Sequence, residues 1–143
     1  MIDRRMTTPS ANVPHAWQRV GDIVVSFTAS GAIDDEVWLQ FVSALGEDGV
    51  RMAFAVTVDE AFGISATQRK SAAEVMQARN LSAVAVTNSR VLRGVLTAVS
   101  WLGAKVKAYP WDALDAAVDA TGATPEQKDQ LRQLALGFRK ATS

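Results

Sequence analysis

The chain contains no cysteine and only one histidine among its 143 residues. Without cysteine it has no disulfide bond, no thiolate metal site and no cysteine nucleophile. The single histidine, His15, gives a Ser-His-Asp arrangement or a histidine metal site little to build on, and the carboxylates are scattered. Neither a Gly-x-Gly-x-x-Gly pattern nor a phosphate-loop pattern occurs. We therefore expect a protein that is not an enzyme and that needs no metal and no cofactor.

Net charge is also absent, because 15 basic residues balance 15 acidic ones. Nucleic-acid binding needs a clustered positive field, so we expect no nucleic-acid partner. A neutral chain does little to keep its copies apart, so a homo-oligomer is a candidate assembly. No apolar run approaches the ~18 residues of a transmembrane segment, and the lack of cysteine fits a cytoplasmic location.

Short apolar runs alternate with helix-length segments, which favours a mainly parallel sheet with helices packed on it. Gly21-Asp22 is a two-residue turn of the Gly-first kind, so the runs on either side of it predict a hairpin. The runs that we expect to be strands are 15–20, 23–28, 52–58, 83–87 and 105–109. The predicted fold is therefore α/β, with a four- to five-stranded mixed sheet, an N-terminal hairpin and helices mainly on one face. Residues 1–14 precede the first run and are expected to form a flexible leader.

The helical segments begin at residues that satisfy the free amides of a helix N-terminus. In chain order the expected capping residues are Asp34, Ser65 with Gln68, Asn88 or Ser89, Pro110, and Thr124 with Gln127. The second helix has a thin apolar face, so we expect it to lie close to the sheet and to bury a modest area. The third helix has a fuller core side, formed by Leu92, Val95, Leu96, Val99 and Leu102.

This order of elements resembles that of STAS domains, the fold of bacterial anti-sigma factor antagonists. The segment from Ala83 to Gly103, Ala-Val-Ala-Val-Thr-Asn-Ser-Arg-Val-Leu-Arg-Gly-Val-Leu-Thr-Ala-Val-Ser-Trp-Leu-Gly, is similar to a less-studied STAS-like bacterial branch that is grouped with lipid-transfer-type sheets. The segment 111–118 is similar to the last helix of the family. The resemblance covers residues 15–121, and residues 122–143 are expected to add a C-terminal helix packed on this domain.

The resemblance implies a candidate phospho-acceptor. In the antagonists a partner kinase phosphorylates a serine at the N-terminus of the helix after the central strand, usually within Asp-Ser-Ser-Gly. That pattern is absent here, and Ser65 is the nearest match, followed by Thr67. A helix N-terminus and Arg69 favour a phosphate at Ser65, whereas the acidic residues Asp59 and Glu60 repel it. The alternative is that Ser65 serves only as a helix cap.

Two helix N-termini, at Ser65 and at Asn88-Ser89, follow strands that we expect to be parallel neighbours. Ligands of α/β sheets bind outside the carboxyl ends of such strands. These three residues therefore form a candidate anion site, with Arg90 and Arg93 nearby. Because every helix N-terminus offers free amides, a purely structural role is the alternative.

A candidate partner interface lies on the third helix. Arg90, Arg93, Thr97 and Trp101 follow one another at intervals of 3, 4 and 4 residues, so they share one helix face roughly opposite the core side. A tryptophan beside arginines is typical of a protein contact. The alternative is that Trp101 folds back against the edge strand or against Trp111.

Together these features favour a non-enzymatic regulatory or scaffolding module for protein–protein interaction. The resemblance places it in signalling, with serine phosphorylation as the switch and a protein partner of unknown identity. The alternative is a carrier or sensor that holds a small ligand, a lipid or a nucleotide, between the helices and the sheet.

Overall fold

A computed structural model describes residues 15–29, 31–58, 64–101 and 105–142, the last four residues of the third range by their backbone alone. The fold is α/β, as predicted, and contains a 5-stranded sheet in the order β1-β2-β3-β4-β5. The hairpin strands β1 and β2 are antiparallel, and the remaining neighbours are parallel. The strands are β1 (His15–Val20), β2 (Ile23–Thr28), β3 (Met52–Thr57), β4 (Ser82–Val86) and β5 (Lys105–Tyr109).

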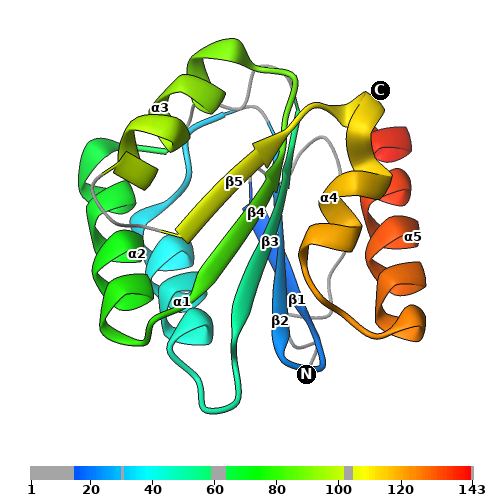
Figure 1. Cartoon of the computed structure of the whole chain (residues 1–143). Coiled ribbons are helices and arrows are strands. Elements are labelled where there is room, and N and C mark those ends of the chain that lie inside the picture. The colour runs from blue at the N-terminus through cyan, green and yellow to red at the C-terminus, as the bar shows by residue number, and fades with distance from the viewer. Residues whose placement is uncertain (1–14, 30, 59–63, 102–104, 143) are drawn as a thin grey trace.

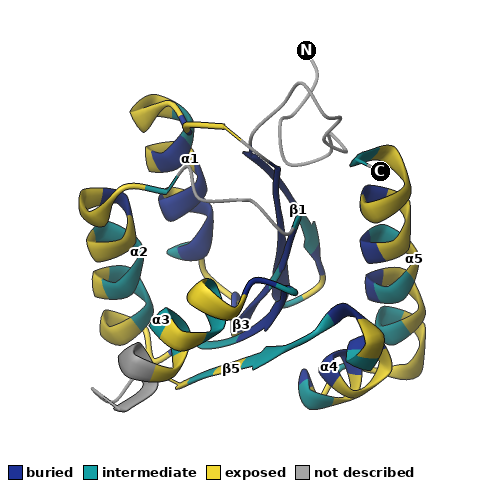
Figure 2. Ribbon diagram, turned by 90° about the horizontal axis from the view of Figure 1, so that it is seen from above, coloured by how far each residue is buried: buried dark blue, intermediate teal, exposed yellow. Residues whose placement is uncertain are grey.

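Helices cover both faces of this sheet (Figures 1 and 2). Each parallel strand lies next to its predecessor, and right-handed crossovers in one direction place their helices on the same face. The three crossover helices are α1 (Asp35–Leu45), α2 (Ala66–Ala78) and α3 (Arg90–Trp101). On the opposite face lie α4 (Leu114–Ala120), which follows a short 3-10 helix (Trp111–Ala113), and α5 (Pro125–Thr142).

The capping signals of the sequence are confirmed in four helices. The Asp34 carboxylate accepts a hydrogen bond from the amide of Glu36 at 2.9 Å. The Ser65 hydroxyl accepts from the amide of Gln68 at 3.1 Å, and the Gln68 side chain accepts from the Ser65 amide at 2.9 Å. Two further helices are capped in the same way. The Thr124–Gln127 pair repeats the box at α5, and Ser89 caps α3 by accepting from the Leu92 amide.

The larger core lies between the sheet and α4–α5. Side chains of alternate strand residues interdigitate there with Leu131, Ala135 and Phe138 of α5, all 0% exposed. Phe27 and Phe54 are also fully buried, and the rings of Phe27 and Phe138 meet at 5.5 Å. The C-terminal helix is therefore an integral part of the core.

The second core lies under α1. Trp38, Phe41 and Leu45 pack there against Trp17 of β1 and Val24 of β2. This placement confirms Trp38 as a core residue, and its indole Nε1 donates to the carbonyl of Gln68 at 2.7 Å. Gln68 is itself buried, and its side-chain amide donates to the Ile33 carbonyl at 2.8 Å and to Asp35 at 2.9 Å. Polar bonds therefore join α2 to α1.

Two expectations about the helix layer are corrected. α2 packs chiefly on α1 and not on the sheet, although it does bury little area, since Gln68 is its only residue classed as buried. The core side chains Leu92, Val95 and Leu96 of α3 are only half-buried. The physical reason is that α3 packs along the edge strand β5, at the margin of the sheet. Residues 1–14, Asp59, Glu60, Leu102 and Gly103 lie outside the described residues.

Candidate functional site

The sheet face that points toward α1–α3 carries small side chains along its central strands. Because side chains alternate between the two faces and the parallel strands are in register, the same-face residues can be read directly from the pairing. We call this set the small-residue face: Ser26, Thr28, Ala53, Ala55, Thr57, Ala83, Ala85 and Thr87. The opposite face of the same strands carries Val, Phe and Met side chains.

Ala55 shows that the helices do not seal this face. It lies in β3, the middle strand, between Ser26 of β2 and Ala85 of β4. A residue at this place can reach solvent only from the α1–α3 side, because its strand has neighbours on both edges. Ala55 and Ala83 are nevertheless partly exposed. The α1–α3 side of the sheet is therefore not completely covered at these two residues, although the other members of the small-residue face are buried.

Hydroxyl groups line the carboxyl edge of the small-residue face. Thr28 and Thr57 are direct partners in the β2–β3 pairing, and Thr87 follows β4 at the level of Thr57. All three are buried, at 3%, 4% and 0% exposed. Neighbouring strands lie about 4.8 Å apart, so the three hydroxyls form a row across the ends of three strands. The ends of parallel strands are where α/β proteins bind ligands.

Trp111 anchors this edge from the opposite side of the sheet. Its indole Nε1 donates to the Thr57 carbonyl at 2.9 Å, and its backbone amide donates to the Asn88 side chain at 2.9 Å. The Arg139 guanidinium lies over the Trp111 ring at 4.9 Å. The backbone of Thr57 is therefore held by a bond that leaves its hydroxyl on the small-residue face.

His15 extends the hydroxyl row onto β1. Its Nδ1 lies 3.1 Å from the hydroxyl of Thr28, and its ring packs against the rings of Trp17, Trp38 and Phe41. Burial lowers the pKa of His15 from 6.5 to about 3, so the ring is neutral at physiological pH. The sequence interpretation gave His15 no role, because it lies at the edge of residues 1–14, the expected flexible leader. The signal it passed over is the alternation of His15 with Trp17, which predicts a shared buried face.

The predicted anion site is only partly assembled. Ser89 is buried and caps α3, and its amide donates to the Thr87 hydroxyl at 3.1 Å. Asn88 does not cap the helix, because its side-chain oxygen accepts from Trp111 on the other side of the sheet. Ser65 lies at the start of α2, exposed, with its hydroxyl in the capping box. Ser89 thus adjoins the hydroxyl row, whereas Asn88 is committed elsewhere.

The candidate phospho-acceptors Ser65 and Thr67 are both exposed. The Arg69 guanidinium, expected to favour a phosphate, donates to the Ile64 carbonyl at 3.3 Å. A phosphate on Ser65 would replace the cap bond to Gln68, and Gln68 in turn contacts the carboxylate of Asp35. The surroundings of Ser65 are therefore those of a structural cap with an acidic neighbour.

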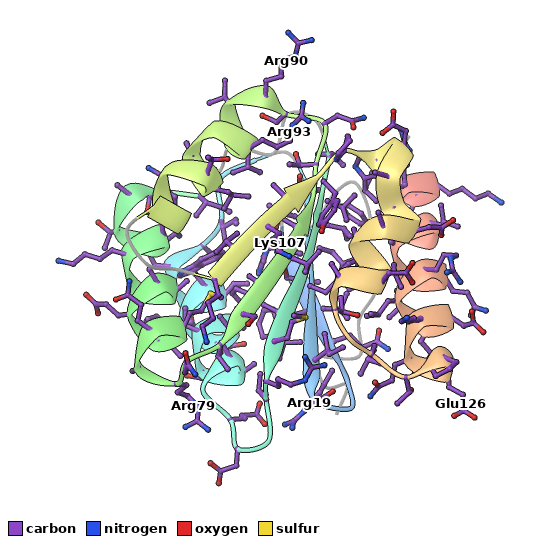
Figure 3. All side chains as sticks on the ribbon, in the orientation of Figure 1. Arg19, Arg79, Arg90, Arg93, Lys107 and Glu126 are labelled. Atoms are coloured by element: carbon purple, nitrogen blue, oxygen red, sulfur yellow. The ribbon has the colours of Figure 1, made fainter. Side chains whose placement is uncertain are left out.

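The residues of the predicted interface do not share one environment. All four lie on α3, as expected, and Arg90 and Thr97 are exposed. Arg93 is half-buried. In Figure 3 Arg90 points away from the molecule at the top of the view, whereas Arg93 lies back against it near the ends of the strands. The side chain of Trp101 lies outside the described part of the chain, so its orientation stays a prediction.

Most buried polar atoms without a hydrogen-bond partner lie on the α1–α3 side. Among the described residues these are His15 Nε2, Trp17 Nε1, Thr57 Oγ1 and Arg93 Nε, and the exception is Asp22 Oδ1 in the hairpin turn. Buried polar groups in proteins are normally paired, so each such atom needs a partner such as water or a ligand. Sequence reasoning missed Thr57 because a threonine at the end of an apolar strand carries no distinguishing pattern.

No protein-family model matches the chain, and neither a curated protein nor a solved structure shows significant similarity to it. Within the described residues no helix is long and apolar enough to cross a membrane. The same residues contain no group of 3 or more His, Cys, Asp or Glu side chains arranged to hold a metal ion.

Proposed function

We propose that this protein is a non-catalytic module that binds a small ligand between the small-residue face and the helices α2 and α3. The observation that carries the proposal is the partial exposure of Ala55 in the middle strand. Small strand residues beneath the helices leave room for a small ligand, and half-buried apolar side chains would line the binding site. These are Leu92, Val95 and Leu96 of α3, with Ala72, Val75 and Met76 of α2 beside them, which also pack against the second core under α1.

The arrangement of polar groups supports the same proposal. Ligand sites in proteins are mostly apolar and contain a few polar groups that fix the orientation of the ligand. Here the apolar walls end at the row formed by Thr28, Thr57 and Thr87, where the Thr57 hydroxyl has no partner. A ligand lying over Ala55 would contact these hydroxyls at the carboxyl edge of the sheet. A lipid or a nucleotide fits this combination.

Native mass spectrometry of the protein purified from cells tests the proposal. We expect a species heavier than the chain by the mass of a small molecule. In the Ala55→Leu variant the larger side chain fills the space, so the added mass should disappear. Ala116→Leu is the matched control, because it makes the same change at an exposed position of α4. Absence of bound mass in the wild type, or its retention in Ala55→Leu, would contradict the proposal.

A second candidate is a module for protein–protein interaction, with exposed residues of α3 as its contact surface. Val91 is 68% exposed beside the exposed Arg90, a pairing of apolar and cationic groups that suits a protein contact. The test is capture of partners by the Arg90→Glu/Val91→Ser variant. The control is Leu136→Ser, a change at an exposed position of α5. The second candidate is supported by a partner that binds the wild type and this control but does not bind the Arg90→Glu/Val91→Ser variant.

A further inference from the structure

The arginines at the two ends of the sheet differ in their partners. At the end where the parallel strands begin, Arg19 pairs with Glu47 at 3.8 Å, Arg51 with Asp22 at 2.7 Å and Arg79 with Asp48 at 3.4 Å. Figure 3 shows Arg19 and Arg79 at this end and Arg93 at the opposite end. No ion pair among the described residues involves Arg93. Within the described part of the chain, Arg93 therefore lacks the carboxylate partner that Arg19, Arg51 and Arg79 each have.

Arg93 is also partly withdrawn from water. Its Nε is buried and has no hydrogen-bond partner, whereas the neighbouring Arg90 is exposed. Withdrawing a charged donor from water without a partner is costly. A guanidinium in this position is best satisfied by an oxyanion, which accepts its N–H groups in a charge-assisted bond.

Thr57 provides an independent second donor at the same edge. Its side chain is 4% exposed, points to the α1–α3 side, and its Oγ1 has no partner. On the next strand Thr87 contacts Ser89, the cap of α3, and Arg93 lies one turn into that helix. The unpartnered hydroxyl therefore faces the region where the positive end of the α3 dipole and the Arg93 charge both favour an anion.

We infer that the small ligand carries an oxyanion, a phosphate or a carboxylate, which Arg93 and Thr57 bind at the carboxyl edge of the small-residue face. This inference rests on the proposed ligand-binding function and specifies the chemistry of the ligand. The anionic group would lie at the threonine row, and the remainder of the ligand would extend over Ala55 between the strands and α2. Arg90 takes no part, because it points away.

Isothermal titration of the full chain with four probes tests this chemistry: octyl phosphate, octanoate, octanol and adenosine monophosphate. We expect at least one anionic probe to bind about tenfold or more tightly than octanol, the contribution of a charge-assisted hydrogen bond. Preference for octyl phosphate or octanoate identifies an amphiphile. Preference for adenosine monophosphate identifies a nucleotide.

Two substitutions assign the binding to the proposed residues. Arg93→Met should lower the affinity for the preferred anionic probe about 10- to 100-fold and leave the affinity for octanol unchanged. Arg90→Met, the same change three residues earlier, should alter the affinity for the anionic probe less than about twofold. Arg93→Lys should restore part of the affinity, because it restores the charge. Thr57→Val replaces the hydroxyl with a methyl group and should lower the affinity for the anionic probe about threefold to tenfold. Circular dichroism confirms that each variant is folded.

The outcomes separate this inference from the function on which it rests. If octanol binds as tightly as the anionic probes, or if Arg93→Met and Arg90→Met behave alike, the oxyanion inference is overturned while ligand binding stands. If none of the four probes binds, the inference is likewise overturned. The proposed function then fails only when native mass spectrometry of the wild type also shows no bound small molecule.

Discussion

Phe54 and Ala55 are neighbours in β3, yet they face two regions of the molecule that are built differently. Phe54 points toward α4 and α5 and is 0% exposed, within a core of phenylalanine, valine and leucine side chains. Ala55 points toward α1–α3 and keeps contact with solvent. Around β3, one face of the sheet is thus closely packed, whereas the other face is incompletely covered at Ala55, beside the second core under α1.

The comparison indicates how stability and function are divided in this protein. Burial of large apolar side chains is the main source of stability, and the α4–α5 face contributes most of it. The α1–α3 face is held partly by polar bonds, such as those of Gln68, and contains the unpartnered atoms of Thr57 and Arg93. Structural stability therefore comes mainly from one face, and the proposed ligand site lies on the other.

The largest effect is expected from Phe54→Ala. The substitution leaves a cavity in the closely packed face and should lower the free energy of unfolding by about 3–5 kcal/mol. Urea unfolding followed by circular dichroism measures the change. A loss below about 1 kcal/mol would show that this face is not the closely packed one.

Gln68→Ala should have the next largest effect, because it removes the polar tie between α2 and α1. It removes the side-chain half of the capping box, the bond accepted from the Ser65 amide, and leaves the buried Ile33 carbonyl without its bond, at a cost of about 2–3 kcal/mol. Gln127→Ala is the matched control, since this exposed box caps α5 and joins no second helix, although the Gln127 side chain also contacts Asp22 of the hairpin turn. It should cost about 1 kcal/mol. Equal losses in urea unfolding would show that the Gln68 tie adds nothing beyond capping.

Lowering the pH should destabilise the aromatic cluster around His15. The pKa of His15 is 6.5 when unfolded and about 3 when folded, so below pH 6.5 the unfolded state binds more protons. The contribution of His15 to the free energy of unfolding is therefore complete above that pH. It falls by about 1.4 kcal/mol per pH unit as the pH decreases toward the folded pKa. Urea unfolding between roughly pH 7.5 and pH 5 should register a loss of about 2 kcal/mol.

The His15→Asn variant identifies the source of this pH dependence. Asparagine does not titrate, so the loss between these pH values should largely vanish. The hydrogen bond from Arg51 lowers the pKa of Asp22 below 3.8, so that carboxylate stays ionised over the range and does not obscure the result. An unchanged slope in His15→Asn would assign the effect to other groups.

The smallest effect on stability is expected from Ala55→Leu. Because space remains above Ala55, the added methyl groups should change the free energy of unfolding by less than about 1 kcal/mol. The contrast is Ala117→Leu on α4, where the side chain is 0% exposed and overpacking should cost about 1–3 kcal/mol. Similar urea midpoints for the two variants would contradict the inference that the two faces differ in packing.

Much of the fold could be predicted from local sequence signals. Gly21 adopts φ +59 in the hairpin turn, and Asn80 adopts φ +55 after α2, as a turn and a left-handed helix stop require. The capping box at Ser65 and the strand 105–109 also lie where expected. These features depend on a few consecutive residues, so their physical causes are contained within the segment.

The site was less accessible to prediction, because its parts come from separate elements. Thr57 ends a strand with no local signal, and its proximity to Thr87 depends on the register of β3 and β4. The difference between Arg90 and Arg93 depends on how α3 turns against β5, and helical spacing alone placed them on one exposed face. Burial of His15 requires α1 to bring Trp38 and Phe41 against the hairpin.

The sequence by itself determined the order of strands and helices, the caps and the alternation that gives β3 one large-residue and one small-residue side. These follow from backbone conformation and from the period of two in a strand. Only the tertiary structure decided that α4 and α5 fill the space beside Phe54 while α2 packs on α1 and leaves Ala55 partly open. The reason is that packing between elements depends on contacts among residues distant in the chain, which no local pattern specifies.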